Sequence, residues 1–139
     1  MTADGAASRL FVYGTLMMPA VLQAVCGRAF TPRPATLDAY ARYRLHAQVY
    51  PAIVPNNGAA VAGLLCEGID GPLWQRLDDW EDEFYTRRSV TVCDDTGALL
   101  GAQTYVLADA YYHLLSSEPW SPAEFERLHL AVYLARWAP

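Results

Sequence analysis

The sequence predicts a single domain of mixed α/β or α+β class, and three observations support this prediction. The chain has 139 residues, enough for one domain with a hydrophobic core. Its residues are 53% hydrophobic and 18% charged, a composition typical of compact globular proteins. Apolar runs that suit strands alternate with segments of helical period, in the order strand, helix, three strands, helix, two strands, helix. We therefore expect one domain over residues 1–139, of which the small and polar residues 1–8 are flexible.

The first elements are a strand and a helix joined by a small polar turn. The strand is predicted over the apolar segment Arg9–Tyr13 and the helix over Pro19–Cys26, since proline is favoured in the first turn of a helix. Gly27 is expected to cap this helix at its C-terminus. The turn at Gly14 has no His, Cys or Lys beside it. It is therefore either an ordinary strand end or a place where bare backbone N–H groups meet an anion.

The middle of the chain is expected to hold three short strands and one irregular connection. Two strands are predicted over Ala35–Leu37 and Tyr43–Ala47. Tyr50-Pro51 and Pro55-Asn56-Asn57-Gly58 carry strong turn chemistry, which indicates an irregular connection. The apolar run Ala60–Glu67 is bounded by glycine and favours a buried strand.

A second helix and a further strand follow. The helix is predicted over Gly71–Trp80, because Leu73, Leu77 and Trp80 recur on one face. The segment Tyr85–Cys93 alternates in the two-residue period of a strand. Its side chains therefore divide between a buried and an exposed face.

The end of the chain predicts a hairpin and a last helix. Residues 94–97, Asp-Asp-Thr-Gly, form a turn into a partner strand over about Ala102–Leu107. The last helix opens with a capping box, Ser121-Pro122-Ala123-Glu124, and reaches about Trp137. Its predicted buried face carries Phe125, Leu128 and Val132.

Charge and composition argue against several classes of partner. The net charge is −5 and the arginines are scattered, whereas nucleic-acid binding needs a basic stripe. The N-terminus resembles no signal peptide, and no apolar run approaches the roughly 18 residues of a membrane span. Cys26, Cys66 and Cys93 are widely spaced and form no CxxC pair. We interpret them as small buried hydrophobic residues of a cytoplasmic protein.

The strongest polar cluster is DDWEDE, residues 78–83, in which five of six side chains are carboxylates. One interpretation is a solvated acidic helix end. Against it, acids at a helix C-terminus oppose the helix dipole, and crowding with partial burial near Trp80 raises a carboxyl pKa. A carboxylate so placed can act as a general base near neutral pH. A Ca²⁺ or Mg²⁺ site is the weaker alternative, because no Asp-x-Asp-x-Asp-Gly loop accompanies the cluster.

Other chemistry has little support in the sequence. His46, His113 and His129 are isolated, and neither a nucleophile elbow nor a glycine-rich nucleotide loop occurs, so we expect no cofactor. His129, beside the apolar face of the last helix, is interpreted as structural. Arg87 is positioned to neutralise a carboxylate of the acidic cluster. Four tyrosines are candidates for lining a polar cavity, although packing at the core edge explains them equally well: Tyr13, Tyr50, Tyr85 and Tyr105.

Five segments in fixed order resemble the γ-glutamylcyclotransferase-like family, which includes the γ-glutamylamine cyclotransferases and the plant avirulence-induced proteins. The resemblance spans roughly residues 9–137, and the C-terminal EPWSPAEFERLHLAVYL is similar to the plant-like branch. The segments are Val12-Tyr13-Gly14-Thr15-Leu16, Tyr50-Pro51-Ala52, Val61-Ala62-Gly63-Leu64-Leu65, Leu77-Asp78-Asp79-Trp80-Glu81 and Tyr85-Thr86-Arg87.

The resemblance implies an α+β fold, a small mixed β-barrel flanked by helices, with a cavity between the YGTL loop and the acidic helix end. It also implies a reaction in which the substrate's own α-amine attacks its γ-carbonyl, releasing an amine and 5-oxoproline. Glu81 is then the general acid and base, and no cofactor or metal is needed. The amides of Gly14, Thr15 and Leu16 would hold the substrate's α-carboxylate, with Tyr13, Tyr50 and Tyr85 lining its site.

Departures from the family pattern leave alternatives open. Asp82 stands where many relatives have glycine, and Glu83 competes with Glu81 for the same role. Met17-Met18-Pro19 replaces a basic segment of the mammalian γ-glutamylamine enzymes, so a γ-glutamyl-lysine substrate is not implied. A non-catalytic binding protein for a carboxylate ligand and an amide hydrolase are the competing hypotheses. The leaving amine and the oligomeric state are left open by the sequence.

Overall fold

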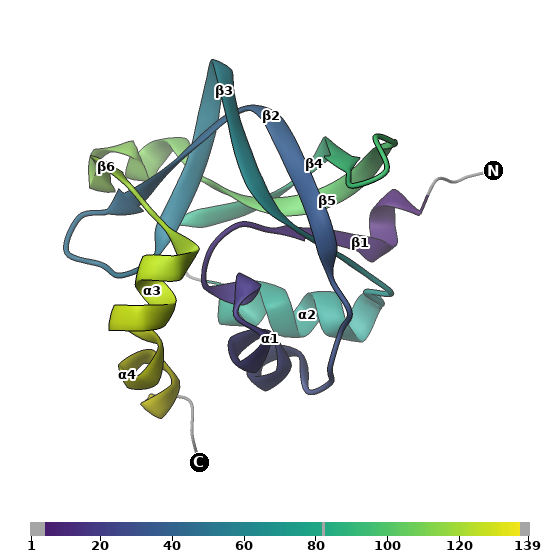
Figure 1. Ribbon diagram of the computed structural model, residues 1–139, viewed down its shortest axis with the longest axis horizontal. Coiled ribbons are helices and arrows are strands. Elements are labelled where there is room, and N and C mark those ends of the chain that lie inside the picture. The colour runs from purple at the N-terminus through teal and green to yellow at the C-terminus, as the bar shows by residue number, and fades with distance from the viewer. Residues whose placement is uncertain (1–4, 82, 137–139) are drawn as a thin grey trace.

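The computed structural model describes residues 5–81 and 83–136 and contains a closed barrel of five strands (Figure 1). The strands follow the order β3-β1-β5-β4-β2, and β2 pairs back onto β3 to close the ring. Because β1 and β5 are parallel and the other pairs are antiparallel, the barrel is mixed, as the family resemblance implied. The barrel strands are β1 (Arg9–Val12), β2 (Arg33–Leu45), β3 (Pro51–Glu67), β4 (Tyr85–Asp94) and β5 (Leu99–Leu107).

The helices gather on one side of the barrel (Figure 1). Buried side chains of α1 and α2 pack with those of β1 in one hydrophobic cluster, while a second cluster fills the barrel itself. A short strand, β6 (Leu115–Pro119), pairs with β2 outside the ring. The remaining elements are α1 (Pro19–Cys26), α2 (Gly71–Trp80), α3 (Pro122–Leu128), α4 (Leu130–Ala135) and the 3₁₀ turns η1 (Ala6–Ser8), η2 (Thr15–Met17) and η3 (Asp109–Leu114).

The first two helices confirm their predicted bounds, since both ends of each carry local signals. Helix α1 begins with Pro19 in its first turn and ends at Gly27, whose φ of 77° is the left-handed conformation that glycine adopts most readily. Helix α2 is capped by Asp70, whose side chain accepts a hydrogen bond from the Leu73 amide at 2.9 Å. Because α2 ends at Trp80, residues 78–81 of the acidic cluster lie at the C-terminus of this helix.

The middle of the chain differs from the prediction, because two long strands replace three short ones. The turn residues 55–58 lie inside β3, where Pro55 still pairs with Tyr40 of β2. The register then shifts, and residues 56–59 bulge opposite Ala39, which has a φ of 66°. The turn chemistry therefore bends a continuous strand pair instead of ending it.

The last predicted helix is broken in two, and its buried face was assigned incorrectly. Ser121 does cap α3, accepting from the Glu124 amide at 3.3 Å. The helix ends at His129 and α4 follows it; Leu128 at the end of α3 is 52% exposed, and Val132 in α4 is 65% exposed. Phe125 is buried as predicted, and Trp137 lies outside the described residues. The 3₁₀ turn η3 and strand β6 were not predicted.

Residues 5–8 of the N-terminal segment make contacts with α2 and the residues before it, while the expected flexibility of residues 1–8 stays a prediction. In η1, the Ala7 carbonyl accepts a hydrogen bond from the Trp74 indole at 2.8 Å, and Ser8 accepts one from the Ile69 amide. Residues 1–4 lie outside the described part. Among the helices of residues 5–81 and 83–136, none is long and apolar enough to cross a membrane.

Candidate active site

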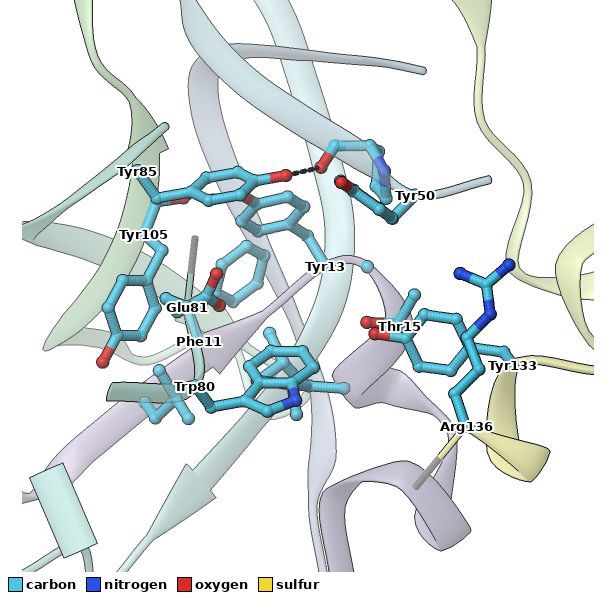
Figure 2. A pocket seen from close by; sticks show the side chains of 15 residues that line it. Phe11, Tyr13, Thr15, Tyr50, Trp80, Glu81, Tyr85, Tyr105, Tyr133 and Arg136 are labelled. Carbon is cyan, nitrogen blue, oxygen red and sulfur yellow. Dashed lines mark hydrogen bonds between the residues drawn. The ribbon is translucent and has the colours of Figure 1, made fainter. Parts of the chain in front are cut away.

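A cavity of about 260 Å³ lies where β1 ends, against the end of α2 (Figure 2). Its volume is close to the lower bound of about 300 Å³ for typical ligand pockets, which suits a small substrate. The walls come from β1 and the loop after it, the end of α2, strands β4 and β5, and the end of α4. The lining residues are Leu10, Phe11, Val12, Tyr13, Gly14, Thr15, Leu16, Tyr50, Pro51, Trp80, Glu81, Tyr85, Tyr105, Tyr133 and Arg136.

The loop after β1 borders this cavity through Gly14, Thr15 and Leu16. The Gly14 carbonyl accepts a hydrogen bond from the Met17 amide at 2.9 Å, which starts the 3₁₀ turn η2. The amides of Thr15 and Leu16 come before this first internal hydrogen bond, so the turn itself offers them no carbonyl acceptor. A Cβ atom on Gly14 would lie 3.1 Å from the Pro51 ring, so glycine lets this loop approach β3 closely.

Tyr13 anchors the loop to the barrel through its hydroxyl group. The hydroxyl donates to the Tyr105 carbonyl of β5 at 2.6 Å. Burial, followed by the charge of Glu81, raises the pKa of the Tyr13 hydroxyl well above its usual value. Tyr13 therefore ties the end of β1 to β5 while its ring faces the cavity.

Glu81 supplies the carboxylate of the cavity. It is the C-cap residue of α2, and its amide donates to the Leu77 carbonyl at 2.9 Å. Its half-buried side chain points into the cavity (Figure 2). The negative charge of Glu81 contributes to the raised pKa of both Tyr13 and Tyr105, which places all three groups in one electrostatic environment.

The other described carboxylates of the acidic cluster are engaged elsewhere. Asp78 accepts a hydrogen bond from the Tyr105 hydroxyl at 2.6 Å and pairs with Arg87 at 3.3 Å, as predicted for that arginine. Asp79 accepts from Gln75, on the exposed side of α2. Glu83 is exposed and accepts from the Tyr111 hydroxyl of η3 at 2.8 Å. Asp82 lies outside the described residues.

All four tyrosines singled out in the sequence line the cavity, and their contacts differ. The Tyr85 hydroxyl donates to the Pro51 carbonyl at 2.8 Å, which joins β4 to β3 beside the loop (Figure 2). The Tyr105 hydroxyl holds Asp78; burial and then this hydrogen bond raise its pKa. Tyr50 stands just before β3. Roles for these residues in substrate binding stay predictions.

Two lining residues come from a part of the chain that sequence reasoning did not connect with the cavity. Tyr133 and Arg136 belong to α4 and its C-terminal cap, and both reach the cavity beside Thr15 (Figure 2). Tyr133 also packs edge-on against Phe125, with 5.5 Å between the ring centres. Tyr133 and Arg136 are three residues apart and therefore share a face of the helix, but nothing in the local sequence links that face to the cavity.

Glu81 also borders a second, more polar hollow. This hollow has a volume of about 330 Å³ and shares Glu81, Tyr85 and Tyr105 with the first cavity. Asp78 and Arg87 complete its lining. Within residues 5–81 and 83–136, no three His, Cys, Asp or Glu side chains are grouped as metal ligands.

Comparisons with known proteins agree with the fold and the motif order. Residues 10–122 match the family described as "Gamma-glutamyl cyclotransferase, AIG2-like". The AIG2-like protein C of Arabidopsis thaliana is 37% identical over 107 residues, which is 76% of this chain and 62% of that protein. The match thus spans less than two thirds of that relative's length.

Solved structures share the barrel. A solution structure of an Arabidopsis thaliana protein is 27% identical, with a TM-score of 0.73 over 94% of this chain and 79% of that one. A structure described as "Gamma-glutamyl cyclotransferase" is 18% identical, with a TM-score of 0.67 over 94% and 85% of the two chains, and this likeness concerns the fold. The family match covers more than half of the chain, so this protein belongs to the γ-glutamyl cyclotransferase, AIG2-like family.

Proposed function

We propose that this protein is an enzyme that cyclises a γ-glutamyl amide to 5-oxoproline and releases the free amine. The observation that carries the proposal is the position of Glu81, a half-buried carboxylate in a small cavity that also contains the backbone of Gly14, Thr15 and Leu16. Such a site offers a carboxylate to move protons and amides to hold an anion. Membership in the family supports the same reaction class.

The substrate carries its own nucleophile, so the protein's tasks are orientation and proton transfer. The α-carboxylate of the γ-glutamyl group would accept hydrogen bonds from the amides of residues 14–16. The rings of Tyr13 and Tyr85 would pack along its aliphatic part. Holding the α-amine against the γ-carbonyl carbon in this way supplies much of the rate advantage of an intramolecular reaction.

Glu81 would perform both proton transfers. Its carboxylate takes a proton from the α-ammonium, and the freed amine forms a bond with the γ-carbonyl carbon. The bond from that carbon to the leaving nitrogen then breaks as the protonated Glu81 returns its proton to the leaving nitrogen, and the second proton of the attacking nitrogen passes to solvent. The products are 5-oxoproline and an amine, and the carboxylate is regenerated. We place this reaction in the cytoplasm, a proposal that the free and buried Cys26 and Cys66 support.

The test combines a substrate panel with a pair of isosteric variants. We expect purified protein to release 5-oxoproline from at least one member of a panel of γ-glutamyl amines and peptides. In the Glu81→Gln variant the turnover should fall by about 10²–10⁴-fold, because general acid–base catalysis typically supplies that factor. The matched control is Glu83→Gln, which neutralises an exposed carboxylate held by Tyr111 and should keep near-normal turnover. Circular dichroism verifies that both variants fold.

Three outcomes would contradict the proposal. Undiminished turnover in Glu81→Gln would remove Glu81 from the mechanism. Free glutamate in place of 5-oxoproline would indicate a hydrolase, with water as the nucleophile. Calorimetric binding of 5-oxoproline without turnover of any panel member would indicate a non-catalytic binding protein.

A further inference from the structure

Arg42 lies directly behind the loop that we propose as the anion site. It is on β2, and its Nη1 atom donates to the Tyr13 carbonyl at 2.8 Å and to the Ala62 carbonyl of β3 at 3.1 Å. Its guanidinium also lies over the Trp120 ring, 5.3 Å from the ring centre. Arg42 is not part of the cavity lining, so it contacts the loop from the opposite side.

This contact fixes the orientation of one peptide group. In a trans peptide the C=O and the next N–H point in opposite directions, and the described residues contain no cis peptide. The carbonyl of Tyr13 is held towards Arg42, so the amide of Gly14 must point away from it. Gly14 lines the cavity and Arg42 does not, so we expect the Gly14 amide to face the cavity.

The charge of Arg42 has an unusual setting. Burial lowers the pKa of its guanidinium, but an arginine remains protonated in proteins. The ion pairs of residues 5–81 and 83–136 involve Arg9, Arg33, Arg44 and Arg87, and none involves Arg42. A half-buried cation that contacts only carbonyl oxygens and a ring is costly to desolvate, and an anion nearby would offset that cost.

We infer that Arg42 is a positioning residue for the α-carboxylate of the substrate, acting through the peptide between Tyr13 and Gly14. The inference rests on the proposed function and adds a residue to it. Arg42 holds the Gly14 amide towards the carboxylate, and its hydrogen bond polarises the same peptide, which strengthens the amide as a donor. One peptide flanked by two hydrogen bonds separates the guanidinium from the carboxylate by about 8 Å, a distance at which charges in a partly buried site still interact.

The test compares two substrates that differ only in the α-group. One is the γ-glutamyl amide that the wild-type protein turns over best, and the other is its α-carboxamide counterpart, which keeps the α-amine but lacks the negative charge. In Arg42→Gln, we expect the KM of the α-carboxylate substrate to rise about tenfold or more with a smaller change in kcat, as expected for a lost charge-assisted contact. The KM of the α-carboxamide substrate should change little.

Two further variants separate this role from general packing. Arg42→Lys keeps the positive charge, so it should retain the preference for the α-carboxylate substrate. Arg44→Gln is the matched control, because Arg44 lies two residues along β2 and pairs with Glu118 away from the cavity. Equal losses with both substrates in Arg42→Gln would overturn the inference and indicate a structural role. Should Arg42→Gln fail to fold, loss of the preference in a folded Arg42→Lys variant would overturn it.

A crystal structure of the Arg42→Gln variant tests this inference independently of the proposed function. Without the guanidinium, the peptide between Tyr13 and Gly14 should rotate, so that the Gly14 amide no longer faces the cavity. An unchanged peptide would overturn the inference even in an active enzyme. Failure of the wild-type protein to produce 5-oxoproline would instead reject the proposed function, and the peptide orientation would still decide the structural part of the inference.

Discussion

At the scale of single residues, a carboxylate outside the site makes the fold sensitive to acid. Asp94 ends β4 and its Oδ1 atom accepts three hydrogen bonds from the turn that follows: from the Thr96 hydroxyl at 2.7 Å and from the Thr96 and Ala98 amides. Its other oxygen pairs with Arg33. The hydrogen bond from the Thr96 hydroxyl, with the amides and Arg33, lowers the pKa of the Asp94 carboxyl.

This lowered pKa predicts how stability depends on pH. The folded state holds the ionised form more tightly than the unfolded state, so the contribution of Asp94 is complete above the unfolded pKa of about 3.9 and is lost as the pH falls below it. We expect the urea midpoint to drop between about pH 4 and pH 2, and to drop less steeply in Asp94→Asn. Equal slopes in the two proteins would show that other groups cause the acid sensitivity.

At the scale of elements, the broken C-terminal helix is a wall of the cavity and part of the core. Phe125 is 1% exposed and contacts both Trp120 and Tyr133, and Tyr133 lines the cavity. Val132, in the same region of sequence, is 65% exposed. The two residues were expected on one face, and the break at His129 separates them.

A pair of alanine substitutions tests this corrected packing. Phe125→Ala should lower the free energy of unfolding by about 3–5 kcal/mol, because it leaves a cavity in a close-packed cluster. Val132→Ala should change it by no more than about 0.5 kcal/mol, as is usual for an exposed position. Urea denaturation followed by tryptophan fluorescence measures both. A similar loss of unfolding free energy at the two positions would contradict this packing and favour a single continuous helix with both residues on its buried face.

The element scale also shows which parts of the structure could be predicted from sequence. The bounds of α1 and α2 were predicted to the residue because the signals that start and stop these helices, proline, glycine and the apolar repeat, are local in the sequence. The bend in β2 and β3 was misinterpreted, because Pro55–Gly58 has the same local chemistry in a bulge as in a loop. What decided the outcome there was pairing with a distant strand.

The candidate site divides in the same way. The motif around Gly14 and the acidic cluster were visible as local patterns, and the resemblance selected Glu81 among five carboxylates. Only the fold shows that Asp78 is held by Tyr105 and Glu83 by Tyr111. Arg42 left no local signal, because its contacts with Tyr13 and Ala62 span 29 and 20 residues of sequence.

At the scale of the whole molecule, the barrel brings β3 and β1 into close approach at Gly63. A Cβ atom at Gly63 would lie 2.4 Å from the Val12 carbonyl oxygen and 2.7 Å from the Phe11 ring. Both neighbours are in the buried strand that leads into the site. The backbone oxygen cannot move away without shifting the strand.

We therefore expect Gly63→Ala to destabilise the protein by about 1–3 kcal/mol, as overpacked cores do. The matched control is Ala62→Val, which adds volume at the neighbouring exposed position of β3 and should be almost neutral. Thermal unfolding of the two variants provides the measurement. If Gly63→Ala were as stable as the wild-type protein, the strands would not be as closely packed as described.

The hydroxyl of Tyr13 bears on how the motif should be interpreted in other sequences. Because it joins the end of β1 to β5, a relative that does not perform the proposed reaction would still use this tyrosine to hold these two parts of its barrel together. The tyrosine of the YGTL signature is thus a marker of architecture, and by itself it does not identify an enzyme.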